Sequence, residues 1–436
     1  MRTPSMSRLV PRAAPALLLG AAALLVSPGS LVSPLSSSTA RADILDPSMP
    51  RTVVVGAPRG EAPSERLDPR RTGRSRAQLP AAPVEVWRRY VSGTIDVAPL
   101  VDDAGNVILA LTNAPELVKL GPDGHELWRA RLGTVGAAAA PTLLADGTIA
   151  VLTGTGVAWG FTPSGAVRFS TPLGISRRDT DTVPLALSDG GLLLAAGNVV
   201  VELDADGVVR ARGTLDDRGA SGAPAAIERA AGAVVESPGG ALVTTATGNV
   251  YRFRPPAAPR KIGSLGGAPG RGAVLADDRT LVAVVDGRRL VALDLPTGTT
   301  HVRTGGVALD APPVIGAGGL VLVTTQLGML LGLDAVGNEK IHVLLEKTSM
   351  TGVTGGGPGG TFLGGGEIKP SPPIVLDPGG RVAFLRSNGR LGLVTPEGHV
   401  DVASERVCPA PVSLQPAGEK RMLIACRDGG LWMYGE

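Results

Sequence analysis

A unit of about forty residues recurs along most of this chain and constrains its fold more than any other feature. Each copy opens with a small residue and usually a proline, as in Ala98-Pro99 and Ala140-Pro141. A short apolar strand follows, then an Asp/Gly turn and three further short apolar segments. Repeats of this length with four strands are typical of β-propeller blades. The sequence therefore predicts an all-β propeller, in which loops rather than blades decide function.

The copies predict eight blades, each starting at one of eight anchor residues: Pro99, Pro141, Pro184, Pro224, Ala273, Pro313, Pro373 and Pro411. The last copy ends after its third strand, at Leu431–Tyr434, whereas Val84–Tyr90 resembles the fourth strand at His125–Arg131. A strand from the N-terminal side that pairs with the last blade covers two open sheet edges. We therefore predict an eight-bladed propeller of four-stranded antiparallel blades over residues 83–436, closed by the N-terminal strand.

Residues 1–42 have the pattern of a secretory signal peptide. Three arginines precede an apolar stretch from Ala13 to Val26, and Ala40-Arg41-Ala42 provides a small-x-small cleavage site. An uncleaved membrane anchor is the alternative, but the apolar stretch of about 14 residues is shorter than the ~20 that span a bilayer. We expect an exported protein without a membrane span, located in the periplasm or outside the cell.

Residues 43–82 are rich in proline and arginine and poor in large apolar residues. Such a composition predicts a disordered tether, because it buries too little apolar surface to fold alone. Contact of its arginines with an anionic surface is the alternative function. The net charge of +3 is small and no nucleic-acid motif is present, so we expect no nucleic-acid partner.

The sequence contains no recognisable constellation for catalysis, cofactor binding or metal binding. The four histidines are predicted at or near the start of different outer strands, too far apart to act together: His125, His301, His342 and His399. Asp204–Gly207 resembles the start of a calcium loop but lacks its later ligands, and is predicted to be a turn. The glycines of 355–360 lack the surrounding strand and helix of a nucleotide site.

The two cysteines, Cys408 and Cys426, flank the first hairpin of the last blade. A turn around Pro416–Gly418 places them on facing strands, where a disulfide can form. An exported protein meets oxidising conditions that favour this bond. Two free thiols are the alternative, since a one-residue register shift separates the side chains.

The link between Leu345 and Ser371 is longer than the other links between blades and is predicted to contact a partner. An exposed Phe-Leu pair between glycines favours a protein partner. Short charged links are expected on the same face as a polar rim. The predicted contact residues are Phe362, Leu363, Glu367, Lys369, Arg177, Arg178, Asp216, Asp217 and Arg218. A tolerated surface insertion is the alternative.

The repeat resembles the PQQ-like, or quinoprotein-dehydrogenase-like, propeller family. The likeness lies in the Ala-Pro opening, the Asp-Gly and Pro-x-Gly turns, and fourth-strand tryptophans at Trp87 and Trp128. Enzymes of the family have a tryptophan in most repeats and often neighbouring cysteines, which this sequence lacks. The resemblance therefore implies the non-enzymatic branch, similar to envelope propellers of the BamB type.

These patterns together predict a monomeric, exported, non-catalytic propeller that binds a protein or an envelope component as a scaffold. Two enzymatic alternatives remain, a PQQ-dependent dehydrogenase and an enzyme that acts on polysaccharide.

Overall fold

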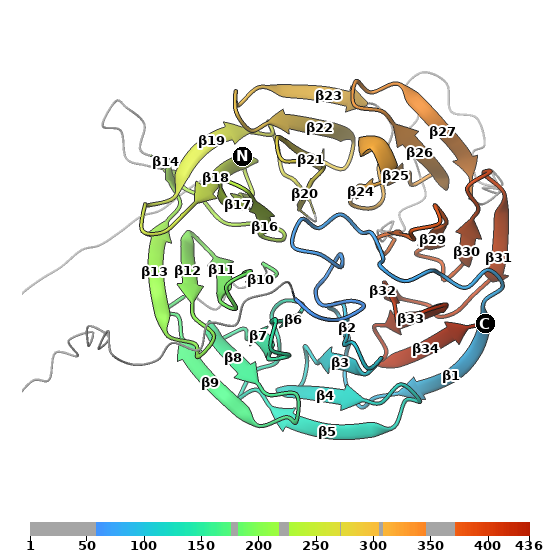
Figure 1. Cartoon of the computed structure of the whole chain (residues 1–436), viewed down its shortest axis with the longest axis horizontal. Coiled ribbons are helices and arrows are strands. Elements are labelled where there is room, and N and C mark those ends of the chain that lie inside the picture. Colours follow the sequence, from blue (N-terminus) through green and yellow to red (C-terminus); the bar gives the residue numbers. More distant parts are fainter. Residues whose placement is uncertain (1–57, 176–181, 218–225, 271, 305–307, 346–370) are drawn as a thin grey trace, which may run out of the picture. The chain divides into compact units, whose positions relative to one another are not determined.

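The computed structural model describes residues 58–175, 182–217, 226–270, 272–304, 308–345 and 371–436. The predicted signal peptide and the first part of the predicted tether lie outside these ranges. The described strands form eight four-stranded antiparallel sheets arranged as a ring (Figure 1). The predicted eight-bladed all-β propeller is confirmed.

Within blades 1 to 7 the strands follow chain order from the centre of the ring to its rim. Blade 1 contains β2 (Leu100–Val101), β3 (Val107–Ala110), β4 (Glu116–Leu120) and β5 (Glu126–Arg131). Blade 2 contains β6 (Thr142–Leu143), β7 (Ile149–Leu152), β8 (Val157–Phe161) and β9 (Val167–Pro172). Blade 3 contains β10 (Leu185–Ala186), β11 (Leu192–Ala196), β12 (Val199–Leu203) and β13 (Val209–Thr214). Blade 4 contains β16 (Val235–Ser237), β17 (Gly240–Thr244), β18 (Asn249–Phe253) and β19 (Arg260–Ser264).

The second half of the ring repeats this order. Blade 5 contains β20 (Ala273–Leu275), β21 (Thr280–Val285), β22 (Arg289–Asp294) and β23 (Thr300–Thr304). Blade 6 contains β24 (Val314–Ile315), β25 (Val321–Thr324), β26 (Met329–Leu333) and β27 (Glu339–Leu344), with the short 3₁₀ helix η1 (Ala317–Gly319) after β24. Blade 7 contains β28 (Val375–Leu376), β29 (Val382–Leu385), β30 (Leu391–Val394) and β31 (Val400–Ser404). No helix in the described ranges is long and apolar enough to cross a membrane.

Blade 8 joins the two ends of the propeller. It contains β32 (Pro411–Pro416), β33 (Arg421–Cys426), β34 (Gly430–Gly435) and, as its outer strand, β1 (Val84–Tyr90). The antiparallel pairing of β1 with β34 runs from Val84 opposite Gly435 to Tyr90 opposite Gly430. Ring closure by the N-terminal strand is therefore confirmed.

The start of blade 4 differs from the prediction. Its inner strand β16 begins at Val235, eleven residues after the anchor expected at Pro224. The link from blade 3 to blade 4 includes an additional antiparallel pair, β14 (Asp216–Asp217) and β15 (Ala226–Ile227). The repeat pattern misplaced the strand because Ala223-Pro224 imitates the small-residue and proline opening of a true blade.

Neighbouring blades are held together by apolar faces and by outer-strand aromatics. Leu152 of blade 2 and Leu194 of blade 3, for example, belong to one buried cluster. Trp87 Nε1 donates a hydrogen bond to Pro122 O of the next blade at 2.8 Å, and Trp128 Nε1 donates to Pro163 O at 3.0 Å. These two tryptophans thus connect blade 8 to the outer turn of blade 1, and blade 1 to the outer turn of blade 2.

Residues 58–82 contradict the predicted disordered tether over the part of it that the structure describes. This stretch, here called the axis segment, crosses the centre of the ring (blue in Figure 1). Leu67 and Leu79 are buried in the cluster that blade 8 shares with its neighbours. The segment has too few apolar residues to form a core of its own, as its composition indicates. It packs instead into a core that the ring already supplies.

Candidate binding cavity on the propeller axis

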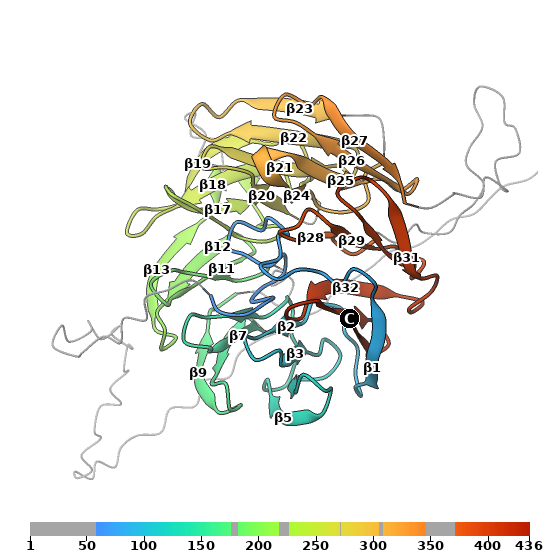
Figure 2. The same ribbon diagram turned by 45° about the vertical axis from the view of Figure 1, so that its right-hand side comes forward.

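The ring has two distinct ends. The turn face carries the turns between first and second strands and between third and fourth strands of each blade. The link face carries the connections from each outer strand to the inner strand of the next blade. Figure 2 shows the blades turned partly side-on, with the axis segment between the inner strands. The two faces differ because the axis segment lies toward only one of them.

The axis segment binds the inner strands near the ends that point to the turn face. Ala62 and Val101 exchange two backbone hydrogen bonds, with N–O distances of 3.1 and 3.0 Å. The amides of five further inner strands donate to carbonyls of the segment: Leu143 to Pro63, Glu236 to Pro69, Leu275 to Arg70, Ile315 to Thr72 and Leu376 to Gly73. The segment therefore satisfies inner-strand amides that no neighbouring strand could reach, and it fills the axis at the turn face.

Gly73 shows how closely the segment approaches the ring. Its φ is 72°, and a Cβ at this position would lie 2.7 Å from Val314 Cγ2. Only glycine combines this backbone conformation with such a short approach at low cost.

Arg71 is the most completely buried charged side chain of the segment, with an exposure of 0%. Its guanidinium donates to Val234 O at 3.1 Å, Pro184 O at 2.7 Å and Glu65 O at 2.8 Å. Burial lowers the pKa of Arg71 to about 10, so it stays protonated at neutral pH. Arg71 thus ties blades 3 and 4 to the axis segment.

Arg66 is almost as buried but is only partly bonded. Its Nη2 donates to Pro313 O, whereas Nε and Nη1 have no hydrogen-bond partner within the part of the chain that the structure describes. Burial lowers the pKa of Arg66 to about 10, and the carboxylate of Glu65 opposes this shift, so the guanidinium remains charged at neutral pH. Unpaired donors on a buried guanidinium are unusual in a folded protein, because most buried polar groups are hydrogen-bonded.

The backbone at Arg66 is also unusual. Arg66 and Leu67 have φ values of 65° and 75°, in the left-handed region that non-glycine residues rarely adopt. Such conformations cost of order 1–3 kcal/mol each and persist where the surrounding structure imposes them.

A cavity of about 600 Å³ lies on the axis between Arg66 and the link face. Glu65, Arg66 and Leu67 contribute to its lining from the axis segment. Its walls come from residues just before the inner strands, among them Ala98, Ala138, Ala139, Ala140, Val183 and Ala233. Asp96 and Arg427 also line the cavity and form an ion pair of 2.6 Å. The cavity therefore has a mainly apolar wall of alanines, and charged residues of the axis segment at its floor.

The partner residues predicted from the sequence are mostly not placed. Phe362, Leu363, Glu367, Lys369, Arg177, Arg178 and Arg218 lie outside the described residues. Asp216 and Asp217 form β14 within the link from blade 3 to blade 4, and Thr214 Oγ1 donates to Asp216 Oδ2 at 2.8 Å. Asp216 is not one of the residues that line the axial cavity. The predicted rim therefore remains a prediction.

The histidines and the turn at Asp204–Gly207 lie where the sequence placed them. All four histidines are exposed on or next to outer strands. Asp204 Oδ1 accepts from the amides of Asp206 and Val208, which fixes the turn expected there. No group of three or more His, Cys, Asp or Glu side chains in the described ranges has a metal-binding arrangement.

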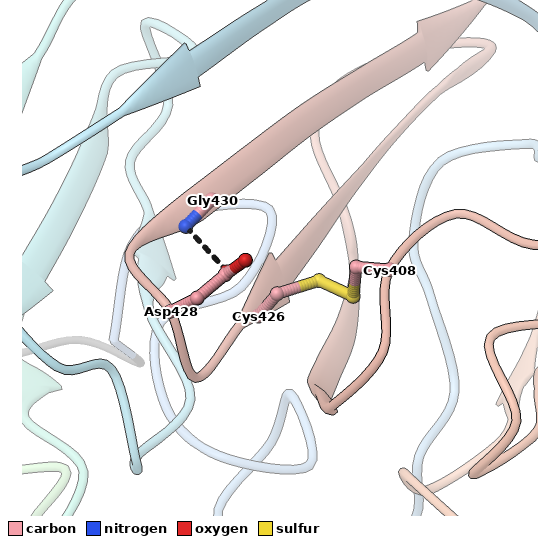
Figure 3. Close-up of a disulfide and its surroundings, with 4 residues drawn as sticks. All are labelled: Cys408, Cys426, Asp428 and Gly430. Carbon is pink, nitrogen blue, oxygen red and sulfur yellow. Dashed lines mark hydrogen bonds between the residues drawn. A yellow bond between two sulfur atoms is a disulfide. The ribbon is translucent and has the colours of Figure 1, made fainter.

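Cys408 and Cys426 are joined by a disulfide in blade 8, with a Cα–Cα distance of 6.5 Å (Figure 3). The expected facing positions are wrong, however, because Pro411 rather than Cys408 lies opposite Cys426 in the pairing of β32 with β33. The bond instead fastens the link that enters blade 8 to the end of its second strand.

Comparisons with known proteins find similarity in structure rather than in sequence. No protein-family model matches the chain, and no curated protein matches it. BamB from Moraxella catarrhalis is similar over 84% of this chain and 97% of its own, at 14% identity and a TM-score of 0.51. Quinohemoprotein alcohol dehydrogenase from Comamonas testosteroni is similar over 86% and 80%, at 11% identity and a TM-score of 0.61. The computationally designed Ika8 protein is similar over 80% and 98%, at 11% identity and a TM-score of 0.58.

The chain shares its fold with these propellers. The similarity to BamB and to the dehydrogenase shows the propeller fold that the sequence repeat predicted. The similarity includes an enzyme and a protein with no enzyme name, so function has to be argued from this chain's own residues.

Proposed function

We propose that this protein is an exported, non-catalytic propeller that binds a protein partner on its link face. The observation that carries the proposal is the asymmetry of the axis. The chain's own segment 58–82 covers the turn-face end of the inner strands, and the large axial cavity lies on the other side of that segment. A propeller of this form presents its recognition surface at one end.

The chemistry of the cavity favours binding. The ionisable residues in its described lining are Glu65, Arg66, Asp96 and Arg427, of which the last two neutralise each other. The lining offers a charge, hydrogen bonds and an apolar wall, which are the features that recognise a partner.

Export is supported by the disulfide as well as by the N-terminal sequence. Cys408 and Cys426 are both buried and bonded, and such bonds persist in oxidising compartments. Mature protein isolated from an envelope or culture fraction, starting after Ala42, would agree with this location. Recovery from the cytoplasm with residues 1–42 intact would contradict it.

Photo-crosslinking in the native cell tests the binding face. A photo-reactive residue replaces exposed Thr155 or Arg288, each in a link-face turn, or exposed Ser164 or Val336, each in a turn-face turn. The proposal predicts one discrete crosslinked partner from the first pair and none from the second pair. Crosslinks from the turn-face positions alone would contradict it.

A dehydrogenase assay addresses the enzymatic alternative. Protein incubated with PQQ and Ca²⁺ should give no dye reduction with alcohols or sugars. PQQ-dependent dye reduction whose rate saturates with substrate concentration would overturn the non-catalytic assignment, whatever partner is found.

A further inference from the structure

We propose that the axial cavity binds an uncharged, extended peptide segment of the partner, which it recognises through the main chain of that segment. This inference rests on the proposed function and names what enters the ring from the link face. The axis segment occupies the turn-face half of the same axis in this way, and the partner segment takes the half that the axis segment leaves open.

The axis segment shows which kind of chain the centre of the ring accepts. It forms an isolated β-bridge with the inner strands of blades 1, 2 and 7: Ala62 with Val101, Ser64 with Thr142 and Arg74 with Leu376. The first two bridges are antiparallel and the third is parallel, so the axis-facing edges accept an extended chain in either direction. Strand edges with unpaired main-chain groups are common templates for an added peptide. The cavity is continuous with this interface, because Glu65 and Gly73 of the axis segment line it.

The wall of the cavity presents main-chain groups. Gly232 and Gly270 lie just before the inner strands of blades 4 and 5, and both line the cavity. Gly232 is partly exposed and Gly270 is exposed, and the exposed surface of a glycine is main chain. The amide of neither glycine donates a hydrogen bond to a residue that the structure describes. A peptide carbonyl that enters the cavity can therefore accept from the wall.

Gln415 adds a side-chain amide to the same wall. It lines the cavity with an exposure of 3%, and its amide has no hydrogen-bond partner in the described part of the chain. The amide atoms are not among the unpaired side-chain atoms that are closed to solvent, so they are accessible from the cavity. A primary amide can donate to a peptide carbonyl and accept from a peptide N–H. Gln415 therefore matches the main chain of a peptide better than it matches a charge.

The charges of the lining balance one another. Its described ionisable side chains are two carboxylates and two guanidinium groups. Asp96 and Arg427 form an ion pair of 2.6 Å, and the carboxylates of Glu65 and Asp68 offset the charge of Arg66. A charged side chain of a ligand would lose its hydration here without gaining a free counter-charge. The cavity therefore selects an uncharged segment.

The size of the wall residues selects small side chains on the peptide. Five alanines line the cavity: Ala98, Ala138, Ala139, Ala140 and Ala233. Such residues let a peptide main chain approach the ring closely, and a volume of about 600 Å³ accommodates a few small residues. The described lining has no aromatic side chain on which a nucleobase would stack.

Calorimetry with the full-length mature protein tests recognition of the main chain. The probe is Ala-Gly-Ala-Gly-Ala with both ends blocked, and the matched control has sarcosine in place of both glycines. Sarcosine keeps the peptide neutral and adds only a methyl group, but it removes two amide N–H groups. We expect saturable binding of the probe and binding of the control that is weaker by about tenfold or more. Equal affinity of the two peptides would overturn the proposal.

Two further peptides test the preference for an uncharged segment. Glutamate or lysine replaces the central alanine of the probe. Each replacement should weaken binding by about fivefold or more, because neither charge finds a free partner in the cavity. Binding of either charged peptide that is as tight as that of the probe, or tighter, would contradict an uncharged ligand.

Two variants locate the bound probe. Gln415→Met should weaken binding by about fivefold, whereas Met at exposed Gln78 of the axis segment should change nothing. Ala138 is partly exposed on the cavity wall, so Ala138→Phe narrows the cavity and keeps the test meaningful where Gln415→Met fails to fold. Loss of probe binding in Ala138→Phe, with an unchanged melting temperature, supports the site. Undiminished binding to Ala138→Phe would place the probe elsewhere and overturn the proposal.

Failure of this inference and failure of the proposed function are distinguishable. If no probe binds while the photo-reactive residue at Thr155 still crosslinks to a partner, the link-face function stands and the peptide site is wrong. If the probe binds as expected while only the turn-face positions crosslink, the cavity takes a peptide but the link face is not where the partner docks.

Discussion

At the scale of single residues, Arg71 connects the axis segment most directly to the ring. Its three hydrogen bonds go to backbone carbonyls just before blade 3, just before blade 4 and within the segment itself. Arg71→Met keeps most of the side-chain volume but leaves these buried carbonyls without a donor. We expect a loss of about 3 kcal/mol or more in the free energy of unfolding, measured with urea.

Arg74→Met is the matched control for Arg71→Met, because Arg74 lies three residues away and is exposed. Its stability should stay within about 0.5 kcal/mol of the wild type. Equal effects of the two substitutions would show that Arg71 is not buried in solution.

The pKa of Asp102 in blade 1 makes the stability of the protein depend on pH. Burial alone would raise its pKa, but hydrogen bonds from Asn106 and Lys119 outweigh burial and lower the pKa below its ordinary value. A carboxylate whose pKa is lowered on folding stabilises the protein above its unfolded pKa. That stabilisation is lost as the pH falls through the folded pKa.

Asp102→Asn should therefore cost about 1–3 kcal/mol at pH 7, where it also leaves buried Lys119 without its ion pair at 2.9 Å. The gap between wild type and variant should narrow as the pH falls below about 4. Urea unfolding of both proteins at pH 7 and pH 3 measures this gap. A gap of constant size would mean that the charge of Asp102 contributes nothing.

At the scale of elements, β1 closes the ring through its backbone. Replacement of Val84–Tyr90 by a Gly/Ser sequence of equal length should lower the melting temperature by several degrees or more, because β34 then becomes an unpaired edge. Serine at Val84 and Val86, whose side chains are 60% and 47% exposed, keeps the strand pairing and serves as control. An unchanged melting temperature for the Gly/Ser protein would contradict closure by β1.

The disulfide fixes the entrance to blade 8. Its loss in a Cys408→Ala, Cys426→Ala protein should cost about 2–4 kcal/mol, since it closes a loop across a sequence separation of 18. A reductant should destabilise the wild type and leave the double variant unaffected. Free thiols in the exported protein, detected by mass spectrometry, would show that the bond does not form.

Some strands could be located from the sequence and others could not. The eight repeats located the blades well, and the short runs Val157–Phe161 and Asn249–Phe253, each of which follows a glycine, form the third strands β8 and β18. The inner strand of blade 4 could not be located, since Pro224 repeats the anchor pattern inside an inserted link. Pairing of Cys408 with Cys426 was expected, but on the wrong register, because the chain before Pro411 leaves the sheet.

The axial cavity and the buried arginines beside it could not be predicted from sequence patterns. Arg66 and Arg71 stand in a proline- and arginine-rich stretch that has no strand period and no apolar face. Their burial depends on carbonyls at Pro313, Val234 and Pro184, more than a hundred residues away. Only the folded ring brings these acceptors to its axis.

At the scale of the whole molecule, the N-terminal region has two structural roles, which two consecutive stretches of the chain fulfil. Residues 58–82 cover the inner strands at the turn face, and the next residues form the outer strand of blade 8. One stretch of chain therefore both closes the ring and gives it two unlike ends, which is the basis for placing the partner on the link face.

Amide hydrogen exchange of the full-length protein tests this account most directly. Amides of the axis segment donate throughout its length, including Ala62 to Val101, Gly73 to Arg66 and Ser75 to Leu376. Peptides that cover residues 58–82 should therefore exchange slowly, with protection comparable to that of the inner strands. Complete exchange of these peptides within seconds, at the rate of an unstructured tether, would contradict the filled axis and the one-sided recognition that follows from it.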